Sequence, residues 1–131
     1  MPRVYQRPNW FLRLVAGPIV AKLGLTSTLA VRGRKTGEWR TIPVNVLSLA
    51  GERYILSPRG ETEWVRNLRT AGTGEVRRAG RTEPFRATEL PVDDRAPIIA
   101  AYRNKWDWQV RAQFDAMPDP KDHPVFRLEP A

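Results

Sequence analysis

Six short runs of alternating apolar and polar residues, separated by turns that contain glycine or proline, make up most of this chain. Alternation with a period of two is typical of strands that bury one face. The runs are residues 28–32, 41–49, 53–57, 75–78, 82–90 and 125–128. Short strands joined without long helical crossovers favour a small antiparallel barrel, and an open α+β sandwich is the alternative. A Rossmann fold is disfavoured, because the long alternation of strands and helices is missing, and no G-x-G-x-x-G sequence follows a strand.

Helical patterns flank and interrupt these runs. Thr62 is expected to cap a helix that continues to about Ala71, where Gly72 ends it. A second helix is expected to begin at Asp93-Asp94 and to continue through Trp106, with residues 107–117 as a further helical piece. Residues 10–22 predict an amphipathic helix that is too short and too charged to span a bilayer.

These elements predict one domain over residues 1–131. The N-terminal helix would occupy residues 1–25, and the barrel core residues 26–90, with the helix at about 62–71 inserted. Residues 91–131 would supply the C-terminal helices and the closing strand. The predicted fold class is therefore mainly β, a small barrel with flanking helices.

The composition limits the chemistry that side chains alone can perform. The chain contains no cysteine and a single histidine, His123, which we expect in a loop. Thiolate chemistry, disulfides and a protein-only metal site are therefore not expected. An enzyme of this composition would depend on a cofactor. The net charge of +8, which comes mostly from arginine, predicts an anionic partner: nucleic acid, anionic lipid or a polyanionic cofactor.

The turn between the first two runs combines two glycines with three cations. Gly33 and Gly37 allow a tight turn and close approach of a ligand to the backbone. Arg34 and Arg40 offer forked donors that match phosphate, and Lys35 adds a point charge. Residues 32–41 therefore predict a phosphate site, with a solvated hairpin loop as the alternative.

Two further segments extend this hypothesis. Pro43 has no N–H group, so its strand should lie at a sheet edge, where free backbone groups could bond a flat ring. Ser57 and Arg59 precede a helix N-terminus, which makes an anion site plausible there. Trp64, in that helix, is expected to pack in the core.

Three segments taken together resemble the deazaflavin-dependent nitroreductase family. They are Gly33-Arg34-Lys35-Thr36-Gly37…Arg40-Thr41…Pro43, Tyr54…Ser57-Pro58-Arg59-Gly60 and Glu63-Trp64-Val65-Arg66-Asn67-Leu68-Arg69. The resemblance covers roughly residues 25–90. It implies a split β-barrel related to flavin-binding barrels, and it implies coenzyme F420, a deazaflavin with a phosphate and an oligoglutamate tail. It also implies hydride transfer from the reduced cofactor to quinones, nitroaromatics or unsaturated carbonyl compounds.

The same resemblance implies roles for individual residues. Arg34, Lys35 and Arg40 would hold the phosphate and acidic tail, with Thr36 and Gly37 in the same cofactor-binding turn. Thr41, Pro43, Val44 and Asn45 would line the deazaflavin, Ser57 and Arg59 would lie near the ring or phosphate, and Trp64 and Asn67 would support the site. Tyr102 is a candidate donor of a hydrogen bond or proton to a substrate oxygen, with packing as the alternative.

Other functions stay open at this point. FMN could replace F420, and the protein could bind F420 without catalysis. A nucleic-acid-binding barrel would need aromatic residues interleaved with cations on an open face, and no such stripe is evident. We expect a cytoplasmic protein that acts on a small hydrophobic acceptor and binds no nucleic acid. Membrane contact through the N-terminal helix and pairing into a homodimer are alternatives that the sequence leaves open.

Overall fold

The computed structural model describes residues 27–131 and is mainly β. The strands are β1 (Ser27–Arg32), β2 (Trp39–Val44), β3 (Leu47–Leu49), β4 (Glu52–Leu56), β5 (Thr73–Arg78), β6 (Arg81–Glu89) and β7 (Val125–Pro130). The helices are α3 (Glu63–Ala71) and α4 (Ala96–Ala116), with 3₁₀ turns η2 (Val92–Asp94) and η3 (Pro120–Asp122). The helix predicted at residues 10–22 lies outside the described residues. Within the described residues, neither helix is long and apolar enough to cross a membrane.

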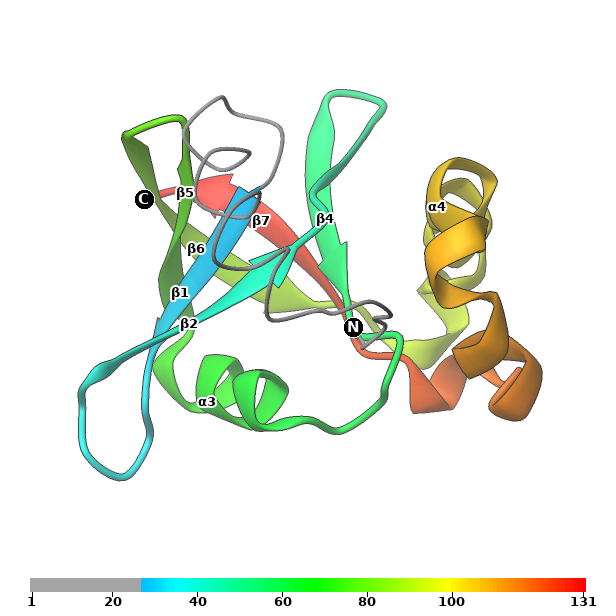
Figure 1. Cartoon of the computed structure of the whole chain (residues 1–131), viewed down its shortest axis with the longest axis horizontal. Coiled ribbons are helices and arrows are strands. Elements are labelled where there is room, and N and C mark those ends of the chain that lie inside the picture. The colour runs from blue at the N-terminus through cyan, green and yellow to red at the C-terminus, as the bar shows by residue number, and fades with distance from the viewer. Residues whose placement is uncertain (1–26) are drawn as a thin grey trace, which may run out of the picture.

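The strands form a strongly curled antiparallel sheet in the order β2-β1-β5-β6-β7-β4-β3 (Figure 1). The two outermost strands are neighbours in the chain: β2 pairs with β1, β3 pairs with β4, and only Asn45 and Val46 separate them. The chain therefore turns a corner at these two residues, which we call the β2–β3 joint, and there carries the sheet round on itself. The predicted barrel is confirmed as a split barrel. The prediction of one uninterrupted strand over residues 41–49 was wrong, because the first part of this run, in β2, pairs with β1 and the last part, β3, pairs with β4.

The position of Pro43 agrees with its missing N–H group. Its strand, β2, is the first in the sheet and forms a ladder only with β1, in which Pro43 lies opposite Thr28. An edge strand is where proline costs least, because one side of the strand makes no ladder.

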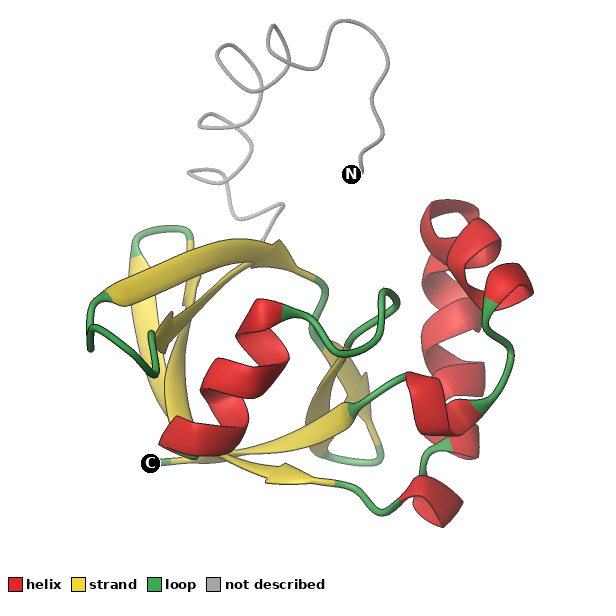
Figure 2. Ribbon diagram, turned by 90° about the horizontal axis from the view of Figure 1, so that it is seen from below, coloured by secondary structure: helices red, strands yellow, loops and turns green. Residues whose placement is uncertain are grey.

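Two apolar clusters hold the molecule together. The inner cluster fills the barrel and includes Leu29, Val31, Ile55, Val65, Leu68, Val76, Phe85, Phe126 and Leu128. Val65 and Leu68 belong to α3, which lies across one end of the barrel (Figure 2). The second cluster packs α4 against β3, β4 and the start of β7 and includes Leu47, Leu56, Tyr102, Phe114 and Val125. The helix α3 is therefore anchored by the barrel interior, beside the β1–β2 turn.

The two ends of α3 lie where the sequence predicts them, but only the C-terminal cap has the expected hydrogen bond. Gly72 has a φ of 72°, the left-handed conformation that glycine favours, and its N–H donates to the Leu68 carbonyl at 2.7 Å. Thr62 has the extended backbone of an N-cap residue, but its side chain makes no capping hydrogen bond. Its hydroxyl is buried without a partner among the described residues. Thr62 therefore marks the start of the helix by backbone geometry alone.

The C-terminal helix begins later than predicted. Asp93 and Asp94 belong to η2, because the N–H groups of Asp94 and Arg95 donate to carbonyls three residues earlier, as in a 3₁₀ turn. Bonding to the carbonyl four residues earlier begins with Ile99 and Arg95, so α4 begins at Ala96. Arg95 donates to the carbonyls of Leu90 and Pro120, each at 3.1 Å. The two predicted helical pieces are joined in α4 across a kink at Trp106, where φ is −128°.

Gly74 brings β5 close to its neighbours. A Cβ atom at this position would lie 2.8 Å from both the Ala30 carbonyl oxygen and the Phe85 ring. We expect Gly74→Ala to lower the free energy of unfolding by about 1–3 kcal/mol, because backbone and a core ring must move. Urea unfolding measures this loss, and Thr73→Ala, at an exposed position of the same strand, is the control. Equal stability of the two variants would contradict the close approach.

Candidate functional site

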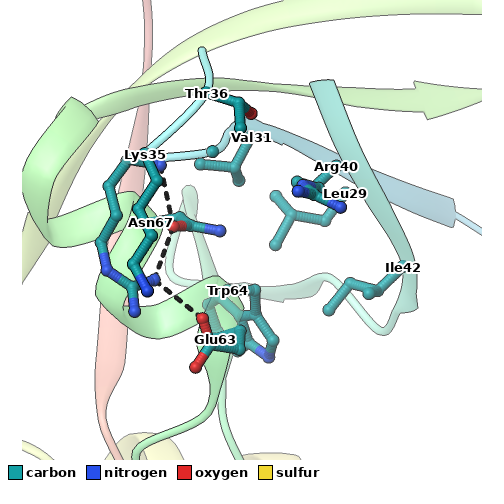
Figure 3. A pocket seen from close by; sticks show the side chains of 11 residues that line it. Leu29, Val31, Lys35, Thr36, Arg40, Ile42, Glu63, Trp64 and Asn67 are labelled. Carbon is teal, nitrogen blue, oxygen red and sulfur yellow. Dashed lines mark hydrogen bonds and ion pairs between the residues drawn. The ribbon is translucent and has the colours of Figure 1, made fainter. Parts of the chain in front are cut away.

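A cavity of about 270 Å³ lies between β1, β2, the turn that joins them and α3 (Figure 3). It is lined by Leu29, Val31, Gly33, Arg34, Lys35, Thr36, Arg40, Ile42, Glu63, Trp64 and Asn67. The cavity thus gathers residues from the basic turn and from the start of α3, which the sequence separates by almost thirty positions.

The strand register explains the wall of the cavity. Leu29 pairs with Ile42, and Val31 pairs with Arg40. Residues directly opposite each other in an antiparallel pair share a face, so these four side chains point to the same side of the sheet. Trp64 of α3 completes the apolar part and packs on Phe126, with ring centroids 5.9 Å apart. The apolar wall is therefore continuous with the barrel interior.

The turn itself is held by short backbone contacts. The Gly33 N–H donates to the Glu38 carbonyl and the Gly37 N–H to the Gly33 carbonyl, both at 2.8 Å. Gly37 has a φ of 77°, which explains why glycine is required at this position. The Glu38 N–H donates to the Thr36 hydroxyl at 3.2 Å. The turn is thus compact and presents Lys35 and Arg40 to the cavity.

The three cations of the cavity do not have the same surroundings. The Arg34 guanidinium donates to Glu63 at 2.9 Å and to the Asn67 side-chain oxygen at 2.8 Å, and the Arg34 backbone N–H donates to that oxygen at 3.1 Å. Arg34 therefore fastens the turn to α3. Within residues 27–131, by contrast, Lys35 and Arg40 form no ion pair with a carboxylate.

The carboxylate in the cavity wall is charged at neutral pH. The hydrogen bond from Arg34, together with the charge of that guanidinium, holds the pKa of Glu63 below its usual value. The cavity therefore carries three positive charges and one negative charge beside an apolar wall. This donor set suits a ligand with an anionic end and a flat apolar part.

Asn67 has a defined orientation in this arrangement. Its side-chain oxygen accepts two hydrogen bonds from Arg34, which fixes which end of the amide is the oxygen. Its nitrogen points the other way, into the cavity (Figure 3). Asn67 can therefore donate to a ligand that enters.

The structure gathers only part of the predicted site. Arg34, Lys35, Thr36, Arg40, Trp64 and Asn67 line the cavity, whereas Gly37, Thr41, Pro43, Val44, Asn45, Ser57 and Arg59 do not. Thr41 and Pro43 are exposed and alternate with the cavity-facing residues of β2. Ser57 is buried and donates to the Gly60 carbonyl at 2.6 Å, while Arg59 is exposed in the turn before α3. The cofactor-binding roles of all these residues stay predictions.

Four lining residues were not predicted: Leu29, Val31, Ile42 and Glu63. Gly33, which also lines the cavity, belongs to the predicted turn. The sequence could have predicted the three aliphatic residues, because pairing the first strand with the second in register places them on the same face as Arg40. For Glu63 the sequence offered less, only its position directly before Trp64.

Tyr102 and His123 lie outside the cavity. Burial raises the pKa of Tyr102, whose hydroxyl accepts a hydrogen bond from the Asn45 amide at 3.1 Å. His123 is fully buried and stacks on Phe114, with ring centroids 4.1 Å apart. Both of its ring nitrogens face backbone carbonyls, those of Ser57 and Met117. His123 therefore serves packing at the base of α4.

Comparison with known proteins identifies the family and supports the fold. Residues 5–115 match the model of the family described as F420H2-dependent quinone reductase. No curated protein sequence matches.

Solved structures that resemble this chain share its fold at low sequence identity. An F420-H2-dependent reductase called FDR-A is 20% identical, with a TM-score of 0.60, over 79% of this chain and 93% of its own. A protein described as a domain-swapped dimer is 18% identical, with a TM-score of 0.61, over 94% of this chain and 100% of its own. An FAD-binding protein from Mesorhizobium loti is 18% identical, with a TM-score of 0.56, over 90% of this chain and 88% of its own.

The family match spans most of the chain, including the basic turn, α3 and most of α4. The resemblance to deazaflavin-dependent reductases is thus confirmed, and so is coenzyme F420 as the cofactor, while the family description specifies quinone reduction. The chain belongs to the F420H2-dependent quinone reductase family, a family of oxidoreductases.

Proposed function

We propose that this F420-dependent oxidoreductase reduces a small hydrophobic quinone, and that the cavity beside α3 receives the phosphate end of the cofactor. Nitroaromatics and unsaturated carbonyl compounds are further acceptors that fit the same chemistry. The observation that carries the proposal is the pair of cations Lys35 and Arg40, which stand beside an apolar wall without a carboxylate partner in the described part of the chain.

The residues of the cavity fit the charged end of the cofactor. Lys35 and Arg40 offer an ammonium and a guanidinium, and Arg34 adds a third positive charge in the wall. Charge-assisted hydrogen bonds of this kind are stronger than neutral ones, and arginine matches phosphate with two parallel donors. A polyanionic cofactor also accounts for an arginine-rich turn in a chain of net charge +8.

The size of the cavity suggests where the ring lies. A volume of about 270 Å³ is at the small end for a ligand site, since pockets for drug-sized ligands occupy about 300–1,000 Å³. The phosphate end can enter, and the ring would then extend along β2 toward Pro43, Val44 and Asn45. These residues would contact the ring from the edge of the sheet, as the resemblance implies.

The chain contributes position and a dry surface. When bound, the reduced cofactor supplies the hydride, from its deazaflavin C5 carbon. Leu29, Ile42 and Trp64 keep water away from the apolar part of the site, and the cations hold the tail in one place. Tyr102 would act only if the acceptor reached the β2–β3 joint, where its hydroxyl contacts Asn45.

Titration of the purified protein with F420 and, separately, with FMN tests this proposal. We expect micromolar or tighter binding of F420, read by its fluorescence, and weaker binding of FMN. Oxidation of reduced F420 should then depend on an added short-chain quinone. FMN binding alone would favour the flavin alternative, and binding of neither would refute the cofactor site.

Pairing with a second copy of the chain, contact with membranes and binding of nucleic acid are each tested by a different measurement. Light scattering of the purified protein reports whether the chain forms a homodimer. Flotation with anionic vesicles reports whether the N-terminal segment contacts membranes. Salt-sensitive binding of DNA or RNA would support the nucleic-acid alternative instead.

A further inference from the structure

Among the residues that the structure describes, a carboxylate pairs with one of the three cavity cations and not with the other two. Arg34 contacts Glu63, while Lys35 and Arg40 form no ion pair within residues 27–131. All four residues line the same cavity. A site built only to attract an anion would have no carboxylate in its wall, because like charges repel the ligand. The placement of Glu63 therefore needs an explanation.

The contact between Arg34 and Glu63 is open to exchange. The side chain of Glu63 is 73% exposed and that of Arg34 is 23% exposed, so the pair lies at the cavity mouth. The same terminal nitrogen of Arg34 also contacts Asn67, at 2.8 Å, so the guanidinium stays anchored when the carboxylate moves. The other carboxylate oxygen of Glu63 already contacts Arg66 at 3.4 Å, so Glu63 keeps a cationic partner when it leaves Arg34. Exposed ion pairs contribute little to stability, so breaking this one costs little.

We propose that Glu63 competes with the cofactor's phosphate for Arg34 and thereby speeds release of the spent cofactor. This inference rests on the proposed binding of F420 in the cavity. On binding, the phosphate displaces Glu63 from Arg34; on release, Glu63 returns. Without the carboxylate, departure of the phosphate would leave the guanidinium without an anionic partner, which makes departure slower.

The rate at which the spent cofactor leaves can limit turnover in this class of reaction. A diffusible hydride donor is spent in every turnover and must leave before a fresh reduced molecule can bind. Binding that is too tight would make product release limit the rate, as it does in many enzymes. A carboxylate that refills the anion site lowers affinity mainly through the dissociation rate, where most affinity differences arise.

Glu63→Gln removes the charge but keeps the size of the side chain. We expect F420 to bind about threefold to tenfold more tightly, mainly because its dissociation slows. Stopped-flow fluorescence measures that rate when the F420 complex is mixed with an excess of pyrophosphate, which prevents released F420 from binding again. The kcat with a saturating quinone should fall while kcat/KM does not. The matched control is Glu61→Gln, which removes an equal charge two positions earlier from a carboxylate that pairs with Arg69, outside the cavity.

A second pair of variants isolates the role of Arg34. In an Arg34→Ala background the gain from Glu63→Gln should largely disappear, because no guanidinium is left to compete for. An equal gain with and without Arg34 would overturn the proposal in favour of general electrostatic repulsion. Weaker or unchanged F420 binding in Glu63→Gln would also overturn it, and weaker binding would make Glu63 a positioning residue for Arg34.

Inorganic pyrophosphate separates this inference from the proposed function. Calorimetric titration of wild type and Glu63→Gln with pyrophosphate does not depend on the deazaflavin. Tighter pyrophosphate binding by the variant, with no F420 binding by either protein, would support the competition and refute the cofactor site. Equal pyrophosphate binding by folded wild type and variant would refute the competition, whatever F420 does.

Discussion

Replacing both Lys35 and Arg40 with alanine is expected to weaken F420 binding by about 100-fold or more. Each side chain can make charge-assisted hydrogen bonds to an anionic ligand, and such bonds contribute about 1.5–3 kcal/mol each. The two cations line the cavity, and within the described residues neither forms an ion pair with a carboxylate. Fluorescence titration at fixed ionic strength measures the loss, and the salt dependence of binding should weaken in the variant.

The control for this experiment removes two cations elsewhere. Arg86 and Lys121 are exposed and lie outside the cavity, so their double replacement changes the net charge by the same amount. We expect less than a threefold effect on F420 binding, because neither side chain lines the cavity and salt screens exposed charges that make no direct contact with the ligand. Equal losses in the two double variants would assign F420 binding to the overall charge rather than to the basic turn.

Arg95→Met is expected to lower the free energy of unfolding by about 3–5 kcal/mol. Arg95 is only 6% exposed and joins the start of α4 to two other segments: it donates to the Leu90 carbonyl and pairs with Glu89 at the end of β6, and it donates to the carbonyls of Pro120 and Lys121 in η3. Methionine keeps much of the apolar stem but no donor, which leaves buried acceptors without partners. Urea unfolding followed by circular dichroism measures the loss.

Arg103→Met provides the comparison for Arg95. Arg103 lies on α4, is about one third exposed and pairs with Asp107 at 2.6 Å. Its replacement should cost less than about 1 kcal/mol, as is usual for an exposed ion pair. Similar small losses at both positions would show that the base of α4 is held by its apolar cluster rather than by Arg95.

Periodicity in the sequence predicted most of the barrel. The strands at residues 28–32, 53–57, 75–78 and 82–90 follow alternation and turn residues closely, because the barrel interior is apolar and the exterior is polar. The break at the β2–β3 joint was not predictable in this way. Asn45 is held there by Tyr102 and Gln109, with hydrogen bonds of 3.1 and 2.9 Å, and both partners lie on a helix more than fifty residues away.

The sequence also indicated part of the candidate site, but not the hydrogen bonds that hold it together. The basic turn followed from its residue types, and Trp64 and Asn67 followed only from the family resemblance; the structure brings them to one cavity. The bond network that fixes them did not, because Arg34 meets Glu63 and Asn67 across 29 and 33 positions of sequence. A motif identifies which side chains can bind an anion. Which of those cations is already engaged within the protein depends on tertiary geometry.

The β2–β3 joint has a consequence for how this chain tolerates a cut. Exposed hairpin turns are the usual places for proteolytic nicking and for new termini in circular permutants. The turns at Ala50-Gly51 and Ala79-Gly80 each join two strands that remain paired in a ladder, so a cut there leaves the sheet closed. A cut between Asn45 and Val46 would instead sever the covalent bond that closes the ring. Permutants opened at the hairpins should therefore keep a closed barrel. A permutant opened at the β2–β3 joint should become an open sheet whose outermost strands, β2 and β3, are no longer connected.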